Sequence, residues 1–489
     1  MLSAICSRIA LAGIAAALCI VPAAHAAVTI SSNATSNMSC VSGVCTPTAA
    51  NAVLNVGDLT SMLASGNVSV NTGTGSLAAQ VEDIIVAATF NWASANALTL
   101  DAYRSVTVTA PVAVNGTAPV SLVTNDGGSG GNLSFVSGGS LSFLGTANSL
   151  SINGMAYTLE NSIATLAAAV AHKPSGRYAL STSFDAAPDG TYKSAPIRTK
   201  FKGTFNGLGN AISNLTVNGN KNIGLFAYME ASGAINSLVL ANAHISARTR
   251  ISGGAAGAVV GANNGTVFNS IASGQINGAL SSQGGSLLGG LVGLNLGTIL
   301  NSSASSAVQA TGNSKQAGYG SIGGLVGGNS GIMRNSFSTG NVSATGASTV
   351  ADSGGLAGSS GGYIANCYSS GNATSSSYAF AGGLVGLANT SIVNSYSTGS
   401  PSDGGGYVGG LVGEDNSKGE FSDDYWDTKT SGITNLSQGA GSPANDSGIK
   451  GETTARLKAA LPAGFDPTIW AENPSINDGL PYLINNPPR

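Results

Sequence analysis

The chain of 489 residues contains few charged side chains: Asp, Glu, Lys and Arg make up only 8% of it, against about 25% in an ordinary globular protein. The formal net charge is -3, and the 19 Lys and Arg form no basic stripe of the kind that binds nucleic acid. Of the three histidines, only His172 and His244 follow the first 26 residues, which excludes a multi-histidine metal site and a histidine-dependent triad. We therefore expect no nucleic-acid partner, no metal and no cofactor.

Long apolar runs are also missing. After the first 26 residues, no stretch reaches the roughly 18 residues that a membrane-spanning helix needs, so we expect no transmembrane segment. Residues 1–26 have the pattern of a secretory signal peptide, with Arg8 before an apolar stretch and the small residues Ala24 and Ala26 at a cleavage site. This pattern predicts a secreted or cell-surface protein, exported through the inner membrane to the outer surface or the medium.

Cysteine is scarce, with Cys40, Cys45 and Cys367 left after the predicted signal peptide. Cys40 and Cys45 enclose a Ser-Gly pair that can turn, so we predict a structural disulfide between them in an oxidising compartment. A metal pair is the alternative, but no His or further Cys lies nearby to complete four ligands. Cys367 occupies a repeat position held elsewhere by serine, which predicts a small, buried and unpaired side chain.

Glycine is abundant, at 70 residues, and a glycine-rich phrase recurs between Gly257 and Gly413. Its fullest copy, at residues 323–342, reads GGLVGGNSGIMRNSFSTGNV. The hydrophobic residue that marks each copy recurs at intervals of 34, 32, 34, 31, 28 and 27 residues, at Leu225, Val259, Leu291, Leu325, Leu356, Leu384 and Leu411. Such a period indicates a solenoid, and the short runs within each repeat fit strands separated by turns. We predict an all-β, right-handed parallel β-helix, with one short helix before the array and a C-terminal cap.

One repeat position is almost always asparagine. Identical amides stacked in register can hydrogen-bond along a ladder, so we predict an inward-facing repeat ladder at Asn236, Asn269, Asn301, Asn335, Asn366 and Asn394. Two residues earlier, an apolar column is expected to fill the interior. Two residues later, Phe337, Tyr368, Tyr396 and Tyr425 form an aromatic column.

Shifts in composition divide the chain. We expect parallel stacking from residue 55 to 422, with DLTSMLASG (58–66) among the first strands, a helix over 160–172 and a short helix over 453–461. The predicted parts are a signal peptide (1–26), an N-terminal segment with the disulfide (27–54), a first β-helical section (55–158), a helix and connector (159–200), a repeat β-helix (201–422) and a cap (423–489).

The recurring phrase GGLVGxNxGxIxNSxSTGxV resembles the GLUG motif of bacterial surface and secreted proteins. KFKGTFNGLGNAISNLTV (200–217) is similar to the coil that often opens such arrays, and YWDTKTSG (425–432) with WAENPSINDGLPYL (470–483) resembles their ending. The section before residue 158 is similar to filamentous-haemagglutinin-like exoproteins of Gram-negative bacteria. The resemblance implies a parallel β-helix with a role in cell adhesion. The Asn-Pro-Asn motifs of that family's secretion domain are missing here, which leaves the export partner open.

Catalysis is the main alternative, because parallel β-helices can carry polysaccharide lyases and glycosidases. Glycoside hydrolysis needs two carboxylates about 5 to 9.5 Å apart, and the acids gather at one place, Glu414, Asp415, Asp423, Asp424 and Asp427. We interpret this cluster as a solvated acidic turn and predict that the chain is not an enzyme and has no catalytic residue. The predicted function is binding to host or neighbouring-cell surfaces or to polysaccharide, with a purely structural matrix role as the third hypothesis; the ligand-binding residues are not identified.

Overall fold

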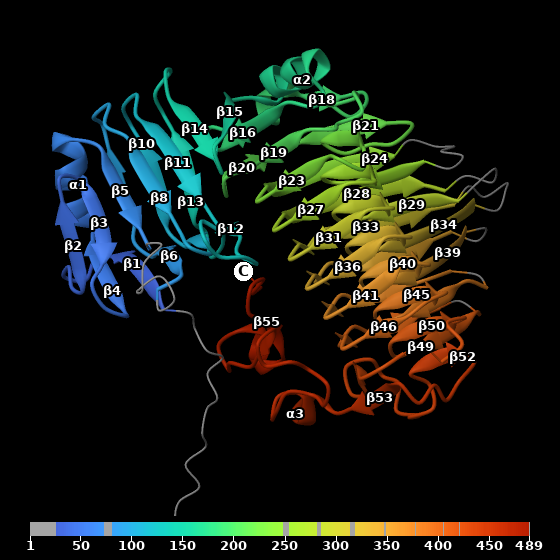
Figure 1. Ribbon diagram of the computed structural model, residues 1–489. Coiled ribbons are helices and arrows are strands. Elements are labelled where there is room, and N and C mark those ends of the chain that lie inside the picture. Colours follow the sequence, from blue (N-terminus) through green and yellow to red (C-terminus); the bar gives the residue numbers. More distant parts are fainter. Residues whose placement is uncertain are drawn as a thin grey trace, which may run out of the picture.

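The computed structural model describes residues 26–72, 81–247, 254–280, 285–312, 318–346, 349–376, 378–403, 405–419 and 421–488. It is a parallel β-helix, as predicted, with strands stacked coil on coil (Figure 1). The predicted signal peptide lies outside the described residues, apart from Ala26. None of the helices in the described part is long and apolar enough to cross a membrane.

Three sheets position the features discussed below. The long sheet runs in the order β2 (Met38–Val41), β3 (Val44–Pro47), β5 (Val68–Asn71), β8 (Leu98–Asp101), β11 (Pro119–Val123), β14 (Ser149–Ile152), β15 (Met155–Glu160), β16 (Arg177–Leu180), β19 (Thr204–Asn206), β23 (Ala234–Asn236), β27 (Thr266–Phe268), β31 (Thr298–Leu300), β36 (Ile332–Arg334), β41 (Tyr363–Ala365) and β46 (Ile392–Val393). The Asn sheet contains β22 (Phe226–Met229), β26 (Val260–Asn263), β30 (Val292–Asn295), β35 (Val326–Asn329), β40 (Ala357–Ser360), β45 (Val385–Ala388), β50 (Val412–Asp415) and β52 (Ala440–Ser442). The Tyr sheet contains β25 (Ala255–Gly257), β29 (Ser286–Gly289), β34 (Gly318–Gly323), β39 (Thr349–Gly354), β44 (Phe380–Gly382) and β49 (Tyr407–Gly409).

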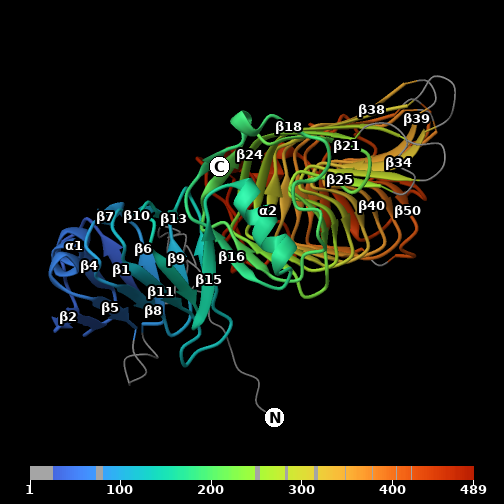
Figure 2. The same cartoon turned by 90° about the horizontal axis from the view of Figure 1, so that it is seen from above.

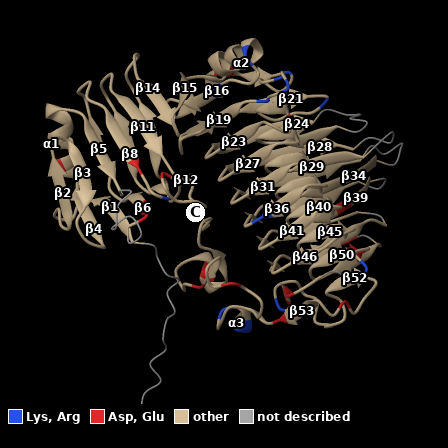
Figure 3. Ribbon diagram, in the orientation of Figure 1, with Lys and Arg blue, Asp and Glu red and all other residues tan. Residues whose placement is uncertain are grey.

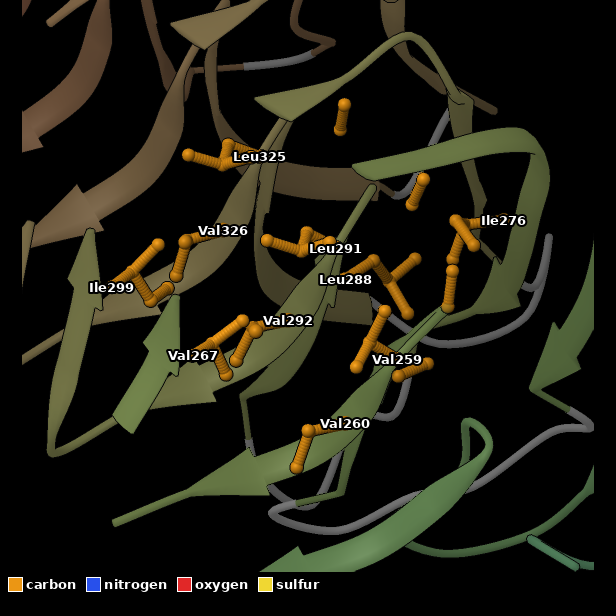
Figure 4. Packing of buried hydrophobic residues seen from close by; sticks show 14 of the residues in the cluster. Val259, Val260, Val267, Ile276, Leu288, Leu291, Val292, Ile299, Leu325 and Val326 are labelled. Carbon is orange, nitrogen blue, oxygen red and sulfur yellow. The ribbon is translucent and has the colours of Figure 1, made fainter. Parts of the chain in front are cut away.

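The recurring phrase folds into one coil per copy. Ile322, Leu325, Val326 and Met333 of one copy are all fully buried, and their counterparts in neighbouring coils pack against them (Figure 4). The glycines of the phrase let the backbones of the Tyr sheet and the Asn sheet approach each other closely. A Cβ added at Gly327 would lie only 2.5 Å from the backbone nitrogen of Leu288, so larger residues are excluded there by backbone contact.

The stacking is not parallel throughout, which corrects the expected continuous array. β14 and β15 pair antiparallel through a tight turn at Asn153 and Gly154, whose φ angles are 50° and 72°. Two consecutive positive φ angles define the Asn-Gly hairpin turn that fits the twist of paired strands. Among the described strands between residues 55 and 422, the chain reverses at this hairpin and forms two sections, a first section before the hairpin and the repeat array after it, which lie side by side in Figures 1 and 2.

Two helices lie at the starts of the two sections. α2 (Ile163–His172) matches the predicted helix, and its Ile163, Leu166 and Val170 are buried in the core of the array (Figure 2). α1 (Val56–Ser65) stands where we expected a strand. Its N-cap Asn55 accepts hydrogen bonds from the backbone nitrogens of Gly57 and Asp58, and its buried leucines join the core of the first section. Capping and core burial together outweigh the local Ser/Thr/Gly composition here.

The predicted asparagine ladder is wrong in its position. Asn269, Asn301, Asn335, Asn366 and Asn394 have φ angles of 49° to 52° and form a left-handed corner of each coil. Asparagine is favoured there because its short polar side chain tolerates this backbone conformation. In the opening copy the same corner is formed by Ser237, with φ 50°, because Ile235 aligns with Val267. Asn236 therefore lies one position before the corner.

A buried amide ladder does exist, in the GxN part of the phrase. Asn263 donates from Nδ2 to Oδ1 of Asn295 at 2.7 Å, and Asn295 donates in the same way to Asn329 at 2.8 Å. Asn329 then donates to the Ser360 hydroxyl at 3.1 Å. The three asparagines are at most 1% exposed. The amides satisfy one another along the coils, which removes the cost of burying each of them alone.

The predicted cap also needs correction. β52 and β53 (Ile449–Glu452) continue the stack, but residues 454–488, which we call the tail, turn back along the side of the array (Figure 1). The tail begins with α3 (Thr454–Leu457) and contains β54 (Trp470–Ala471) and β55 (Tyr482–Leu483). It covers the predicted aromatic column, whose rings stack at 4.6 Å between Phe337 and Tyr368 and 5.1 Å between Tyr368 and Tyr396. This column points outward, so a covering segment is needed to bury it.

Candidate functional site

The predicted cysteines are found in two structural roles. Cys40 and Cys45 face each other across the β2–β3 hairpin and form a disulfide. Cys367 is free and fully buried, and burial raises the pKa of its thiol to about 12. It aligns with serines whose hydroxyls accept a backbone N–H from the neighbouring coil, as Ser395 accepts from Cys367 itself at 3.1 Å. Its surroundings give the thiol no activation as a nucleophile.

The interpretation of the five acidic residues as a solvated turn is wrong, because Asp415, Asp424 and Asp427 are buried. Asp424 and Asp427 are 0% exposed, and both accept backbone N–H groups, Asp424 from Ser395 at 2.8 Å and Asp427 from Lys429 at 2.8 Å. Asp423 instead forms an ion pair with Lys450 at 3.1 Å. Asp415 accepts from the backbone and hydroxyl of Ser417. These four carboxylates serve local structure, and only Glu414 lies near another feature of interest.

That feature is a group of side chains that we call the tyrosine strip: Tyr319, Asp352, Phe380 and Tyr407 on strands of the Tyr sheet, and Tyr378 in the bend that leads into β44. Strand pairing places Asp352 of β39 opposite Ser321 of β34, and Phe380 of β44 opposite Tyr407 of β49. The rings of Phe380 and Tyr407 are stacked, with centroids 5.9 Å apart. Tyr319, Tyr378 and Tyr407 are 49%, 83% and 51% exposed. Large aromatic side chains left open to solvent near the same sheet make this surface a candidate binding face.

The strip carries few charges. Figure 3 shows the strands of the array almost free of charged residues, with acidic side chains gathered near its last coils. Asp352 is half-buried, and desolvation, aided by the negative charge of Glu414, raises its pKa to about 7. Burial also raises the pKa of Glu414. The strip could not be predicted from the sequence. Its members lie in the variable ends of the repeats, and only the strand register brings them together.

The raised pKa of Asp352 predicts a pH-dependent stability. The folded protein binds this proton more tightly than the unfolded chain, whose value is 3.8. The unfolding free energy should therefore be highest below pH 4 and fall as pH rises to about 7. We expect a loss of about 1 to 2 kcal/mol, discounted because the side chain is partly exposed. Urea unfolding at pH 4, 5.5 and 7 measures it.

The matched variants are Asp352→Asn, which should remove this part of the pH dependence, and Glu414→Gln, which should reduce it by removing the repelling charge. An equal slope in all three proteins would contradict the assignment to Asp352.

A cavity of about 600 Å³ lies at the junction of the first section and the array. Its walls come from β14, β15, the start of α2 and the loop that precedes β14, and most of its lining residues are polar: Thr146, Asn148, Ser149, Tyr157, Thr158, Glu160, Asn161, Thr165, Ser181 and Thr182. The Leu144 side chain stands at its edge, 60% exposed. The hairpin at Asn153 and Gly154 creates this cavity. It could not be predicted from the sequence, because parallel stacking was expected throughout this part of the chain.

Comparison with known proteins identifies no family for this chain. No protein-family model and no curated protein sequence matches the chain. Among solved structures, a chain named "IgA1 Protease" matches 57% of this chain at 17% identity, with a TM-score of 0.39. The matched part spans 23% of that longer chain.

The prediction that the chain is not an enzyme has to be corrected. A solved chain with partly similar architecture is named as a protease. The lack of a recognisable catalytic motif in the sequence therefore does not place this protein among non-enzymes. Fold alone does not decide activity, because the same architecture can host unrelated functions.

Proposed function

We propose that this protein is an exported, adhesin-like β-helix of the GLUG type that binds neutral glycan chains on host or neighbouring-cell surfaces through the tyrosine strip. The observation that carries the proposal is the exposure of the aromatic rings of Tyr319, Tyr378 and Tyr407, together with the stacking of Tyr407 on Phe380. Aromatic rings with a polar tip bind well where one side of the ligand is apolar and the other is hydrated, as is the case for a sugar ring.

The composition of the array supports the same ligand class. The stacked coils repeat at about 4.8 Å, and a repetitive face of this kind can make many similar weak contacts with a polymer. Such contacts add through effective concentration even when each is weak. With 8% charged residues in the chain, binding should depend little on salt, because few ion pairs are available to be screened. The Cys40–Cys45 disulfide fits an oxidising compartment outside the cytoplasm.

The proposal is tested with residues 27–489 on a panel of immobilised neutral and acidic polysaccharides. Tyr378→Ala combined with Tyr407→Ala should lower the retained amount at least tenfold, because both rings are exposed and no core contact is lost. Tyr363→Ala is the matched control, since this tyrosine lies on the outer face of the long sheet. Equal losses for both variants, or no retention of any polysaccharide by the parent, would contradict the proposal and favour a structural role.

Cleavage of the bound glycan is a second candidate, favoured by one observation. Asp352 lies beside the exposed rings, and its pKa of about 7 is in the range suited to a general acid at neutral pH. Product analysis on each polysaccharide that is retained tests this candidate. Soluble oligosaccharides released by the parent and not by Asp352→Asn would establish it, while retention without products would leave binding as the function.

A further inference from the structure

We infer that the junction cavity is a second binding site, which takes a single neutral sugar residue or a similar small polyol. The cavity is separate from the tyrosine strip, and the inference does not depend on the strip binding polymers. Its volume of about 600 Å³ lies within the range of about 300 to 1,000 Å³ that is typical of small-molecule sites.

The side chain of Asn148 holds one wall of the cavity in place. Its Nδ2 donates to the backbone oxygens of Gly116 at 2.9 Å and Ala118 at 3.1 Å, in the preceding coil. These two bonds tie the loop before β14 to that coil, so this wall of the cavity is formed before any ligand binds.

Glu160 provides an acceptor from the opposite section. It is the last residue of β15, only 6% exposed, and it lines the cavity. Burial raises the pKa of its carboxyl group, while a hydrogen bond from Thr165 lowers it. In the part of the chain that the structure describes, no Lys, Arg or His lines the cavity. The site therefore presents acceptors and hydroxyl groups to its ligand, and it offers an anion nothing to neutralise its charge.

These features select the ligand by its chemistry. A ligand that supplies several donors and no negative charge suits a wall whose charged group is the Glu160 carboxylate, and the hydroxyl groups of a sugar are such donors. The Ser and Thr hydroxyls of the wall can donate or accept as needed. Tyr157 and the exposed Leu144 offer an apolar surface to the hydrophobic face of a sugar ring. Acidic sugars should be rejected. Among the described lining residues the charged group is the Glu160 carboxylate, and its negative charge would repel an acidic sugar.

The experiment uses residues 27–489 and ligand-observed NMR, followed by calorimetry, with methyl glucoside, methyl mannoside, methyl galactoside, N-acetylglucosamine and glucuronic acid as probes. We expect millimolar or tighter binding of at least one neutral probe and none of glucuronic acid. Glu160→Gln should weaken binding at least tenfold. Thr146→Trp should abolish it, because Thr146 is exposed at the cavity wall and the indole would fill the opening without disturbing the core.

Controls separate this site from the strip and from folding. The Tm of Thr146→Trp should equal that of the parent, and Tyr407→Ala should bind the small probes as the parent does. Three results would each overturn the inference: binding that survives Thr146→Trp, preference for glucuronic acid, or no binding of any neutral probe at a concentration of about 20 mM. None of these outcomes bears on retention of polysaccharides by the tyrosine strip.

Discussion

Trp470→Ala is expected to lower the free energy of unfolding by about 3 to 5 kcal/mol, the cost of emptying a fully buried aromatic site. Trp470 is 0% exposed, and its ring lies 4.6 Å from that of Phe465 and 6.0 Å from that of Tyr368. Its indole N–H also donates to Oδ1 of Asn366 at 3.3 Å. Trp470 therefore holds the tail against the outward aromatic column, and its loss exposes that column.

The measurement is urea unfolding combined with limited proteolysis. In Trp470→Ala, the tail should become sensitive to protease at concentrations of urea at which the array is still folded, because Trp470 is the largest tail side chain in the cluster that packs the tail on the aromatic column. The hydrogen bonds of Tyr396, Tyr425 and Asn486 to the tail would remain. Trp470→Phe is the control and should lose much less, since it keeps a ring in the site. A single cooperative transition with unchanged stability in Trp470→Ala would show that the tail does not depend on this residue.

Asn295→Leu should destabilise the array by about 2 to 4 kcal/mol, because each of two buried amides loses one hydrogen-bond partner. The Nδ2 of Asn263 would lose its acceptor and the Oδ1 of Asn329 its donor. Leucine branches at Cγ as asparagine does but is larger, so the loss combines the missing hydrogen bonds with some overpacking of the core. Thermal and urea unfolding measure it.

The matched variant is Asn335→Leu, at the corner position. Asn335 has φ 49° and takes no part in the amide ladder, so the expected cost is about 1 to 2 kcal/mol from the left-handed backbone conformation alone. Asn335→Gly should be nearly neutral, because glycine adopts this conformation without strain. If Asn335→Gly proved as costly as Asn295→Leu, the corner asparagine would have a side-chain role that these contacts do not include.

The sequence by itself determined the class of fold, the period of the repeats and the place of the disulfide. The physical reason is that these depend on local or strictly repeated features. A glycine-rich phrase that returns every 27 to 34 residues can bury its apolar column only by stacking. A Ser-Gly turn brings Cys40 and Cys45 together whatever the rest of the chain does.

Tertiary structure alone decided which columns face inward, where the stack reverses and what covers the aromatic column. Both asparagine columns repeat with the same period, and only the backbone conformation shows that Asn335 forms a corner while Asn295 forms the ladder. The hairpin at Asn153 and Gly154 looks like any other turn in a strand-rich sequence, yet it reverses the chain and opens the junction cavity. The tyrosine strip and the contact of Trp470 with Asn366 join residues from different coils, 104 positions apart in the latter case. No local pattern specifies such contacts, because they follow from the register of stacked strands and from the return of the tail.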